Sequence, residues 1–309
     1  MTLLREDPAI ELRVVAPDDH DGVLAAMAWA EAVTVRTYPL TGELLGTAPG
    51  LRLVSKHGIG TDNIDVAHCT ERGIPVAIAA GSNDRSVAEW SIMALLAIAK
   101  RATMLDGWVR AGAWERRLEN APRDIEDRTL LVVGLGRIGR RVARMAAALD
   151  MAVIAYDPWL PAQRRDPAIP MVERLEDGLA RADAVSLHMP RTPETEGMLG
   201  RKAFEALKPG ALLVNASRGG IVDEAALREA LDAGILAGAA LDVLEDEPPA
   251  PDDPMLARSD VLLSPHAAAL TQEGARRMAV MAASRVLDLA RGTLEPGWLV
   301  NAGVLDPPA

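Results

Sequence analysis

Three segments in the second half of the chain carry the side chains best suited to acid–base and anion chemistry. They are Val214–Glu224, Ala240–Pro248 and Leu262–Thr271, and each starts in a short apolar run typical of a buried strand. His266 is the candidate general acid, because imidazole titrates nearest to neutral pH. Arg218 offers a planar fork of N–H donors that fits a carboxylate. Since open α/β sheets bind ligands beyond the carboxyl ends of their strands, we expect these segments to form one site.

Acidic residues follow the second of these strands and could orient the candidate acid. Asp242 ends the strand, and Glu245, Asp246 and Glu247 come soon after it. A carboxylate bound to one ring nitrogen favours the protonated imidazole, but spacing alone does not choose among the three later acids. His188 is a second candidate acid. For each of these residues the alternative is a structural or surface role.

A glycine-rich turn provides a candidate nucleotide site. The stretch Thr129–Arg141 is typical of a strand that runs into Gly134-x-Gly136-x-x-Gly139 and then into a helix. The first glycine permits a tight turn, the second lets a pyrophosphate approach the backbone, and the third lets the helix pack closely on its strand. The helix N-terminus then presents N–H groups to the phosphates. By itself the motif is weakly specific.

Asp157 strengthens this prediction. It closes the next predicted strand, 18 residues after Gly139, where its carboxylate can accept hydrogen bonds from an adenosine ribose. The same negative charge would repel a 2′-phosphate, which favours NAD over NADP. The alternative is that Asp157 only caps a turn before Pro158.

Strands and helices that must position these residues alternate along most of the chain. Short β-branched or Leu-rich runs are separated by segments with helical periodicity, which predicts an α/β fold of parallel sheets with helices on both faces. The predicted strands are Leu12–Ala16, Leu51–Ser55, Pro75–Ala79, Thr129–Val133, Ala152–Tyr156, Ala184–His188, Ala211–Asn215, Gly238–Asp242 and Asp260–Ser264.

Two long helical patterns divide the chain into domains. Ser86–Gly112 is predicted as one helix that crosses from a first domain to a second, and Gln272–Arg291 as the helix that leads back. The tail from Leu294 would then rejoin the first domain. We therefore expect a substrate-binding catalytic domain formed by residues 1–97 and 288–309, and a nucleotide-binding domain formed by residues 98–287.

Composition narrows the functional classes. The 309 residues are 49% apolar, 25% charged and 3% aromatic, which predicts two globular domains with aliphatic cores. The formal net charge of −11 argues against a nucleic acid or an anionic membrane surface as partner. The single cysteine, Cys69, permits no internal disulfide, and no metal site is predicted. The start of the chain has no signal-peptide pattern and no apolar run is long enough to span a bilayer, so we expect a cytoplasmic protein.

Six motifs in order resemble the D-isomer-specific 2-hydroxyacid dehydrogenases, a family that includes phosphoglycerate, hydroxypyruvate and D-lactate dehydrogenases. They are SKHGIGTDNID at 55–65, GLGRIG at 134–139, LHMPRTPET at 187–195 and the three segments named first. The resemblance is to short members without a C-terminal regulatory domain. It implies two doubly wound domains, with a Rossmann NAD-binding domain inserted into a flavodoxin-like substrate domain. It also implies NAD as cofactor, a homodimer, and interconversion of a D-2-hydroxy acid with its 2-keto acid.

The resemblance assigns roles to individual residues, and it selects Glu247 among the three acids because this residue directly precedes Pro248. It implies that His188 lies beside the cofactor, and that Lys56 adds a positive charge to the substrate loop unless it is a solvated lysine. The implied catalytic residues are Arg218, Glu247 and His266. The implied substrate contacts are Lys56, His57, Gly58, Ile59 and Arg218. The implied cofactor contacts are Gly134, Gly136, Arg137, Ile138, Gly139, Asp157, Met189, Pro190, Ala216, Ser217, Asp242 and Ala268.

Other functions on the same scaffold remain alternatives. A dinucleotide-sensing binding protein, similar to the C-terminal binding protein corepressors, would keep the same three catalytic residues. A phosphite or formate dehydrogenase is a further alternative, although formate dehydrogenases carry Gln where Glu247 stands. Trp90 stands where the family often has His, which alters the pocket but not the catalytic set. The sequence does not specify the side chain of the acid, so glyoxylate, hydroxypyruvate, 3-phosphoglycerate and sulfolactate-type acids stay open.

Overall fold

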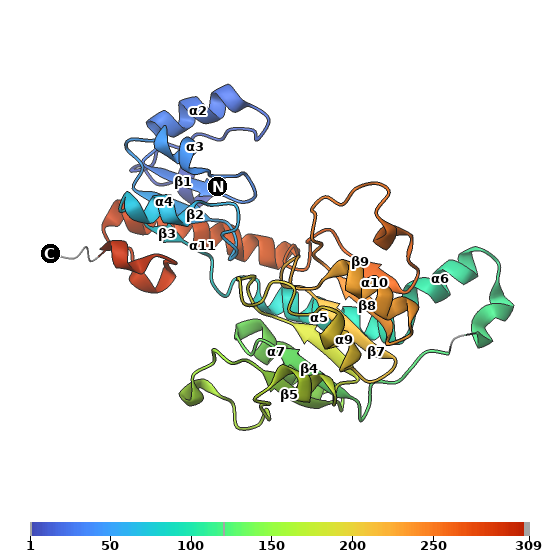
Figure 1. Cartoon of the computed structure of the whole chain (residues 1–309). Helices are drawn as coiled ribbons and strands as arrows, with labels where there is room; N and C mark the ends of the chain where they lie inside the picture. The colour runs from blue at the N-terminus through green and yellow to red at the C-terminus, as the bar shows by residue number, and fades with distance from the viewer. Residues whose placement is uncertain (1, 120, 306–309) are drawn as a thin grey trace. The chain divides into compact units, whose positions relative to one another are not determined.

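The chain divides into two compact units, each with its own parallel sheet (Figure 1). The computed structural model describes residues 2–119 and 121–305. Unit 1 comprises the described parts of residues 1–83 and 272–309, and unit 2 is the continuous segment Asp84–Thr271, which is inserted into unit 1. The divisions fall at the starts of the two long helical patterns, whereas the sequence placed them within those patterns, near residues 97 and 287.

Unit 1 is built on a three-stranded sheet in the order β1-β2-β3. Alternate residues of β2 pack on opposite sides: Val54 contacts the cluster that contains Leu45 of α3 and Cys69 of α4, and Leu53 packs with Val286 of α11. The elements of unit 1 are α1 (Thr2–Arg5), α2 (His20–Trp29), β1 (Ala32–Val35), α3 (Gly42–Gly46), β2 (Leu53–Lys56), α4 (Val66–Glu71), β3 (Val76–Ala77), α11 (Gln272–Arg291), and the short 3₁₀ helices η4 (Pro296–Trp298) and η5 (Ala302–Leu305).

The tail after α11 does rejoin the first unit. Leu299 forms an antiparallel bridge with Ala77, and the side-chain oxygen of Asn301 accepts a hydrogen bond of 2.8 Å from the backbone N–H of Val76. These contacts confirm the predicted return as far as Leu305. Residues 306–308 of the predicted tail lie outside the described residues.

Unit 2 is built on a six-stranded parallel sheet in the order β5-β4-β6-β7-β8-β9. Its elements are α5 (Asp84–Ala99), α6 (Ala102–Arg110), η1 (Trp114–Leu118), β4 (Thr129–Val133), α7 (Arg137–Ala147), β5 (Ala152–Tyr156), η2 (Ala162–Arg164), α8 (Leu175–Leu179), β6 (Ala184–Leu187), α9 (Arg201–Glu205), β7 (Ala211–Asn215), α10 (Glu224–Asp232), β8 (Leu236–Leu241), η3 (Pro254–Ala257) and β9 (Val261–Leu263).

The sheet of unit 2 is buried on both faces. Leu131 and Val133 of β4 belong to one apolar cluster, which Leu179 of α8 and Phe204 of α9 complete. Leu130 and Val132 of β4 belong to a second apolar cluster, which also contains residues of α5 and α7. Because successive strand residues point to opposite faces, two complete cores require helices on both sides. The doubly wound fold predicted from the sequence is confirmed.

Strand order reverses between β4 and β6, and this reversal creates the place where such sheets bind ligands. From β4 the chain continues outward to β5, beyond which Met171 forms a parallel bridge with Ala155. The later strands β6 to β9 add on the other side of β4. Loops that leave the carboxyl ends of β4 and β6 therefore diverge and leave a crevice between them.

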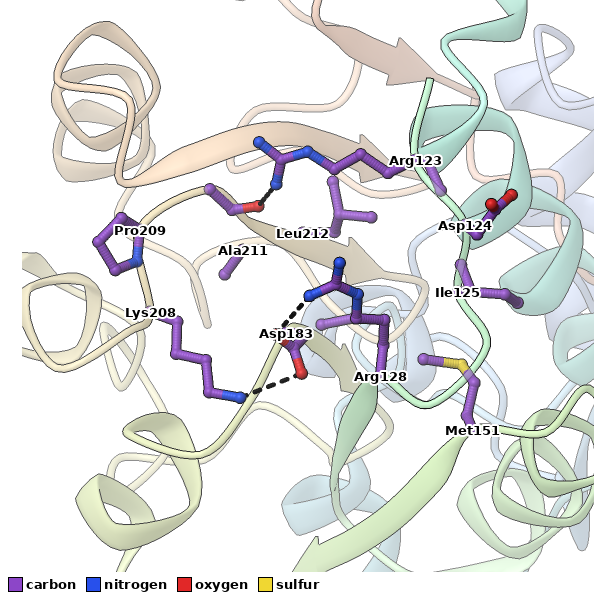
Figure 2. A pocket seen from close by; sticks show the side chains of 13 residues that line it. Arg123, Asp124, Ile125, Arg128, Met151, Asp183, Lys208, Pro209, Ala211 and Leu212 are labelled. Atoms are coloured by element: carbon purple, nitrogen blue, oxygen red, sulfur yellow. Dashed lines mark hydrogen bonds and ion pairs between the residues drawn. The ribbon is translucent and has the colours of Figure 1, made fainter. Parts of the chain in front are cut away.

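At the amino ends of the strands of this sheet, ion pairs connect neighbouring segments (Figure 2). Asp183, which directly precedes β6, lies 3.1 Å from Nζ of Lys208 and 3.7 Å from Nη1 of Arg128. Arg123 donates a hydrogen bond of 2.7 Å to the carbonyl of Gly210. These groups surround a cavity of about 70 Å³. We interpret them as a network that fixes the amino ends of β4, β6 and β7.

The predicted elements that agree best with the structure are three strands of unit 2 and one helix of unit 1. The strands β4, β5 and β7 and the helix α11 have the predicted bounds. The predicted strand Leu12–Ala16 is wrong, because this segment is irregular and mostly exposed. The predicted single helix Ser86–Gly112 is also wrong: it breaks at Arg101, whose φ of 51° is left-handed, and continues as α6. In the described residues no helix is both long and apolar enough to cross a membrane.

Candidate active site

The three glycines of the turn after β4 meet three different steric conditions. Gly134 has a φ of 89°, and a Cβ there would lie 2.6 Å from the carbonyl oxygen of His188. A Cβ on Gly139 would lie 2.1 Å from the carbonyl oxygen of Gly134. At Gly136 a Cβ would meet no atom within 4 Å. The first and third glycines are therefore required by the fold, whereas the second faces space that a ligand can occupy.

A cavity of about 400 Å³ opens beside this turn, at the reversal of strand order. Its walls come from the turn itself, the loop after β5 and the loop after β6. The lining residues are Val133, Gly134, Gly136, Tyr156, Asp157, Pro158, Trp159, Leu160, Pro161, Arg164, His188, Met189, Pro190, Thr192, Glu194 and Thr195. The size and the mixed apolar and polar walls suit a small-molecule ligand.

Asp157 lies in the wall of this cavity and also caps the local backbone. Its Oδ2 accepts a hydrogen bond of 2.9 Å from the N–H of Leu135, and its Oδ1 accepts one of 3.2 Å from the N–H of Trp159. A carboxylate has about four acceptor sites, so two backbone bonds leave capacity for two hydroxyl groups. The capping role and the ribose role are therefore compatible. The open Gly136 and this carboxylate together fit the ribose and pyrophosphate of a dinucleotide.

His266 and Glu247 form a hydrogen-bonded pair. Nδ1 of His266 lies 2.8 Å from Oε2 of Glu247, and the two side chains are 48% and 39% exposed. The other carboxylate oxygen of Glu247 accepts a hydrogen bond of 3.2 Å from the N–H of Leu244. Because Nδ1 of His266 is bound to Glu247, Nε2 is the ring nitrogen that could exchange a proton with a ligand. The structure thus pairs the histidine with the one acid that the family resemblance selects.

Asp242 builds the loop that carries His266. Its buried carboxylate accepts hydrogen bonds from the hydroxyl of Ser264 at 2.7 Å, from the N–H of Ala267 at 2.8 Å and from the N–H of Ala268 at 2.9 Å. The N–H of His266 in turn donates to the carbonyl oxygen of Asp242 at 2.7 Å. Asp242 therefore fixes the backbone on both sides of the histidine.

Arg218 lies in a turn that packs against the loop of Glu247. Its Nη1 donates to the carbonyl of Ser217 at 2.7 Å, and its own carbonyl accepts a hydrogen bond of 3.1 Å from the amide of Asn215. A Cβ on the next residue, Gly219, would lie 1.8 Å from the carbonyl oxygen of Leu244. This close approach brings the arginine turn into contact with the segment that leads to Glu247.

His188 does not fit the role of a general acid. Burial lowers the pKa of His188 to about 3, so the ring is neutral at physiological pH. Its Nε2 lies 2.8 Å from the hydroxyl of Ser186, and the residue lines the cavity. His188 is therefore placed beside the candidate cofactor site.

The loop after β2 belongs to unit 1 and contains the predicted substrate contacts. Lys56 is 8% exposed, and its Nζ donates to the side-chain oxygen of Asn63 and to the carbonyl of Arg36. The alternative of a solvated lysine is excluded. Burial lowers the pKa of His57, with a smaller contribution from the charge of Arg36. Gly58, with a φ of 146°, and Ile59 complete the loop.

The remaining predicted cofactor contacts lie close to the turn or to the Asp242 loop. Met189 and Pro190 line the cavity, and Ile138 of α7 packs, partly buried, against the second apolar cluster. Ser217 is buried and donates to Asn215, with Ala216 between them. Ser264, Asn215 and Asp84, which support these residues, were not predicted from the sequence. Each is a polar residue at the end of a strand or the start of a helix, which is too common a pattern to identify it.

Comparison with known proteins identifies the family. Residues 92–268 match the sequence family described as "D-isomer specific 2-hydroxyacid dehydrogenase, NAD binding domain". A D-3-phosphoglycerate dehydrogenase of Archaeoglobus fulgidus is 39% identical over 284 residues, which cover 92% of this chain and 54% of that protein. A glyoxylate reductase of Korarchaeum cryptofilum is 40% identical over 283 residues, which cover 88% of this chain and 83% of that protein. This chain belongs to the D-isomer-specific 2-hydroxyacid dehydrogenase family.

Solved structures agree with this assignment. A D-lactate dehydrogenase from Aquifex aeolicus, complexed with NAD and lactic acid, superposes with a TM-score of 0.82 at 30% identity, covering 90% of this chain and 89% of that one. The predictions of the family, of the fold and of an NAD-binding domain are confirmed. The chain spans about half the length of the phosphoglycerate dehydrogenases that it matches.

Proposed function

We propose that this protein is an NAD-dependent dehydrogenase that interconverts a D-2-hydroxy acid and its 2-keto acid. The observation that carries the proposal is the hydrogen bond of 2.8 Å between His266 and Glu247. It provides an oriented acid–base group in the same unit as a dinucleotide-type glycine turn. The relatives named phosphoglycerate dehydrogenase and glyoxylate reductase support the same reaction class.

The cofactor is held by the residues around the large cavity. Gly136 and the N-terminus of α7 take the pyrophosphate, Asp157 accepts hydrogen bonds from the adenosine ribose, and Met189 and Pro190 form part of the wall. When bound, NADH supplies a hydride to the carbonyl carbon. The negative charge of Asp157 opposes a 2′-phosphate, so we propose NAD rather than NADP.

The reaction also needs a proton and a fixed substrate carboxylate. The guanidinium of Arg218 binds the carboxylate with its parallel N–H donors and orients the carbonyl. His266 donates the proton from Nε2 to the oxygen that becomes the alcohol, while Glu247 accepts the Nδ1–H and stabilises the imidazolium. In the oxidative direction the neutral imidazole accepts the same proton. We further propose that backbone N–H groups of residues 57–59 bind the carboxylate, with the charge of Lys56 behind them.

The substrate is a small 2-keto or 2-hydroxy acid. Glyoxylate and 3-phosphoglycerate are the first to test, because relatives are named for these acids, and hydroxypyruvate follows from the family resemblance. We also propose a cytoplasmic homodimer with no nucleic-acid or membrane partner. The segment of α6 and η1 supports a dimer, because both elements lack buried residues and expose Trp114 and Leu118, the latter to 85%.

The test is NADH oxidation with a panel of 2-keto acids that includes glyoxylate and hydroxypyruvate, together with NAD reduction by 3-phosphoglycerate, both monitored by NADH absorbance. We expect turnover with at least one of these acids, the D configuration wherever reduction gives a product that is chiral at C2, and much slower turnover with the phosphorylated cofactor (NADPH or NADP). His266→Ala is the matched control, and it should bind NADH but turn over at least about 100-fold more slowly. Tight NADH binding without turnover on any member of the panel would contradict the proposal and favour a dinucleotide-sensing protein.

A further inference from the structure

Arg137, the first residue of α7, is ion-paired with a carboxylate from a different helix of unit 2. Its Nε lies 2.9 Å from Oδ2 of Asp84, the first residue of α5. The side chain of Asp84 is 4% exposed and that of Arg137 is 62% exposed. The two residues are 53 positions apart in sequence. The pair therefore joins the glycine turn to a helix outside the nucleotide-binding motif.

At the N-terminus of α7, the positive charge of Arg137 is stabilised by a nearby anion. The N-terminus of a helix carries partial positive charge, which disfavours a cation there, and the first turn of α7 contains no acidic residue. Asp84 supplies a negative charge from its own favourable place at the N-terminus of α5. A buried carboxylate without a cation is costly. Each partner thus stabilises the other.

The pairing leaves part of the guanidinium for a second anion. Arginine has five N–H donors in a rigid planar fork, and the contact to Asp84 is made by Nε. The terminal nitrogens belong to a side chain that is more than half exposed. Arg137 directly follows Gly136, where a Cβ would meet no atom within 4 Å. One arginine can therefore hold the buried carboxylate and a phosphate at the same time.

We propose that Asp84 is a positioning residue for the dinucleotide, which holds Arg137 so that its terminal N–H groups meet the pyrophosphate. The proposal rests on the proposed NAD-binding function and extends it to α5. A mobile arginine loses side-chain entropy when it binds, and prior ordering by Asp84 reduces that loss. From the usual cost of immobilising one long side chain, the expected gain is about 3- to 10-fold in affinity.

A double-mutant cycle tests this role through binding alone. The variants are Asp84→Asn, Arg137→Met and the double variant, and the readout is the dissociation constant of NADH and of ADP-ribose without substrate. In the parent background, Asp84→Asn is expected to weaken the binding of NADH and of ADP-ribose by about 3- to 10-fold. In the Arg137→Met background, the same change is expected to weaken the binding of each ligand by less than about 2-fold. Glu89→Gln is the matched control, because Glu89 forms an exposed ion pair with Arg85 on the same helix.

Further measurements separate positioning from a loss of folding. Adenosine has no phosphate, so its binding should be unchanged in Asp84→Asn, whereas a misfolded variant would lose it too. Asp84→Glu keeps the charge and should bind ADP-ribose to within about 2-fold of the parent, even if the Asn variant does not fold. Unchanged or tighter NADH binding in Asp84→Asn, or an equal loss with and without Arg137, would overturn the inference. If the parent protein itself fails to bind NADH, the proposed function is refuted first.

Discussion

Replacing Gly219 by Ala tests whether the arginine turn must touch the loop of Glu247. The new Cβ would lie 1.8 Å from the carbonyl oxygen of Leu244, 2.5 Å from its carbonyl carbon and 3.0 Å from the N–H nitrogen of Glu245. All three are backbone atoms, so no side-chain rotation relieves the overlap. The two loops must therefore move apart.

The size of this movement sets the expected effect. Carbon and oxygen atoms need more than 3 Å of separation, so the loops must separate by more than about 1 Å. Overpacking of this kind typically costs 1–3 kcal/mol, and for a unit of this size each kcal/mol lowers Tm by about 2–4 °C. A displacement of about 1 Å between catalytic groups costs on the order of 100-fold in rate. We expect a lower Tm and a loss of kcat/KM near that factor.

The assay measures Tm, NADH affinity and kcat/KM for the best keto acid in the same preparations. Gly219→Ala should keep NADH binding within about 3-fold, because the glycine turn is untouched. Gly136→Ala is the reciprocal control: its Cβ meets no atom, so Tm should stay parental while NADH binding falls. Parental Tm and parental kcat/KM in Gly219→Ala would refute the reasoning that close contact of these loops organises the site.

Four further variants probe other parts of the proposal. His266→Ala should lower kcat by about 10²- to 10⁴-fold with NADH affinity unchanged; near-parental turnover would exclude it as the acid. Asp157→Ser should shift the kcat/KM ratio towards NADPH by at least about 10-fold, which is about 1.4 kcal/mol, in paired titrations of the two cofactors. Lys56→Met should raise KM for glyoxylate about 10-fold with a smaller change in kcat, because the substrate loop loses its positive charge and Asn63 and the carbonyl of Arg36 lose their donor; an unchanged KM would separate Lys56 from the substrate. Serine at both Trp114 and Leu118 should convert a dimer to a monomer in light scattering, and a parent that is already monomeric would contradict the proposed interface.

Periodicity was sufficient to predict the elements that lie inside a sheet. The strand β4, for example, is a run of buried aliphatic residues bounded by turn signals, and both of its faces enter a core. The segment Leu12–Ala16 also contains β-branched residues, but Val14 is exposed, and among the described residues no strand pairs with this segment. The missed strand β1 is short and only partly buried, so its pattern is weak.

Long-range contacts explain what the sequence could not predict. The break between α5 and α6 has no Gly or Pro to mark it; it occurs where the buried residues of α5 end and a segment without buried residues begins. The pairing of His266 with Glu247 was predicted only through the family resemblance, since three consecutive acids satisfied the spacing. The ion pair of Asp84 and Arg137 joins two motifs whose sequences contain no sign of each other.

The backbone at His266 restricts which residues evolution or protein engineering can place there. Its φ of 50° lies in the left-handed region, which costs most residues about 1–2 kcal/mol and is best tolerated by Gly, Asn, Asp and His. Histidine is the only one of these with a side chain that readily gives and takes a proton at neutral pH. In a saturation library at this position those four residues should therefore give the most stable proteins, other residues including Ala should fold with about 1–2 kcal/mol less stability, and β-branched residues should be the most depleted. The turn fixed by Asp242 thus limits the chemical repertoire of this position before any substrate is bound.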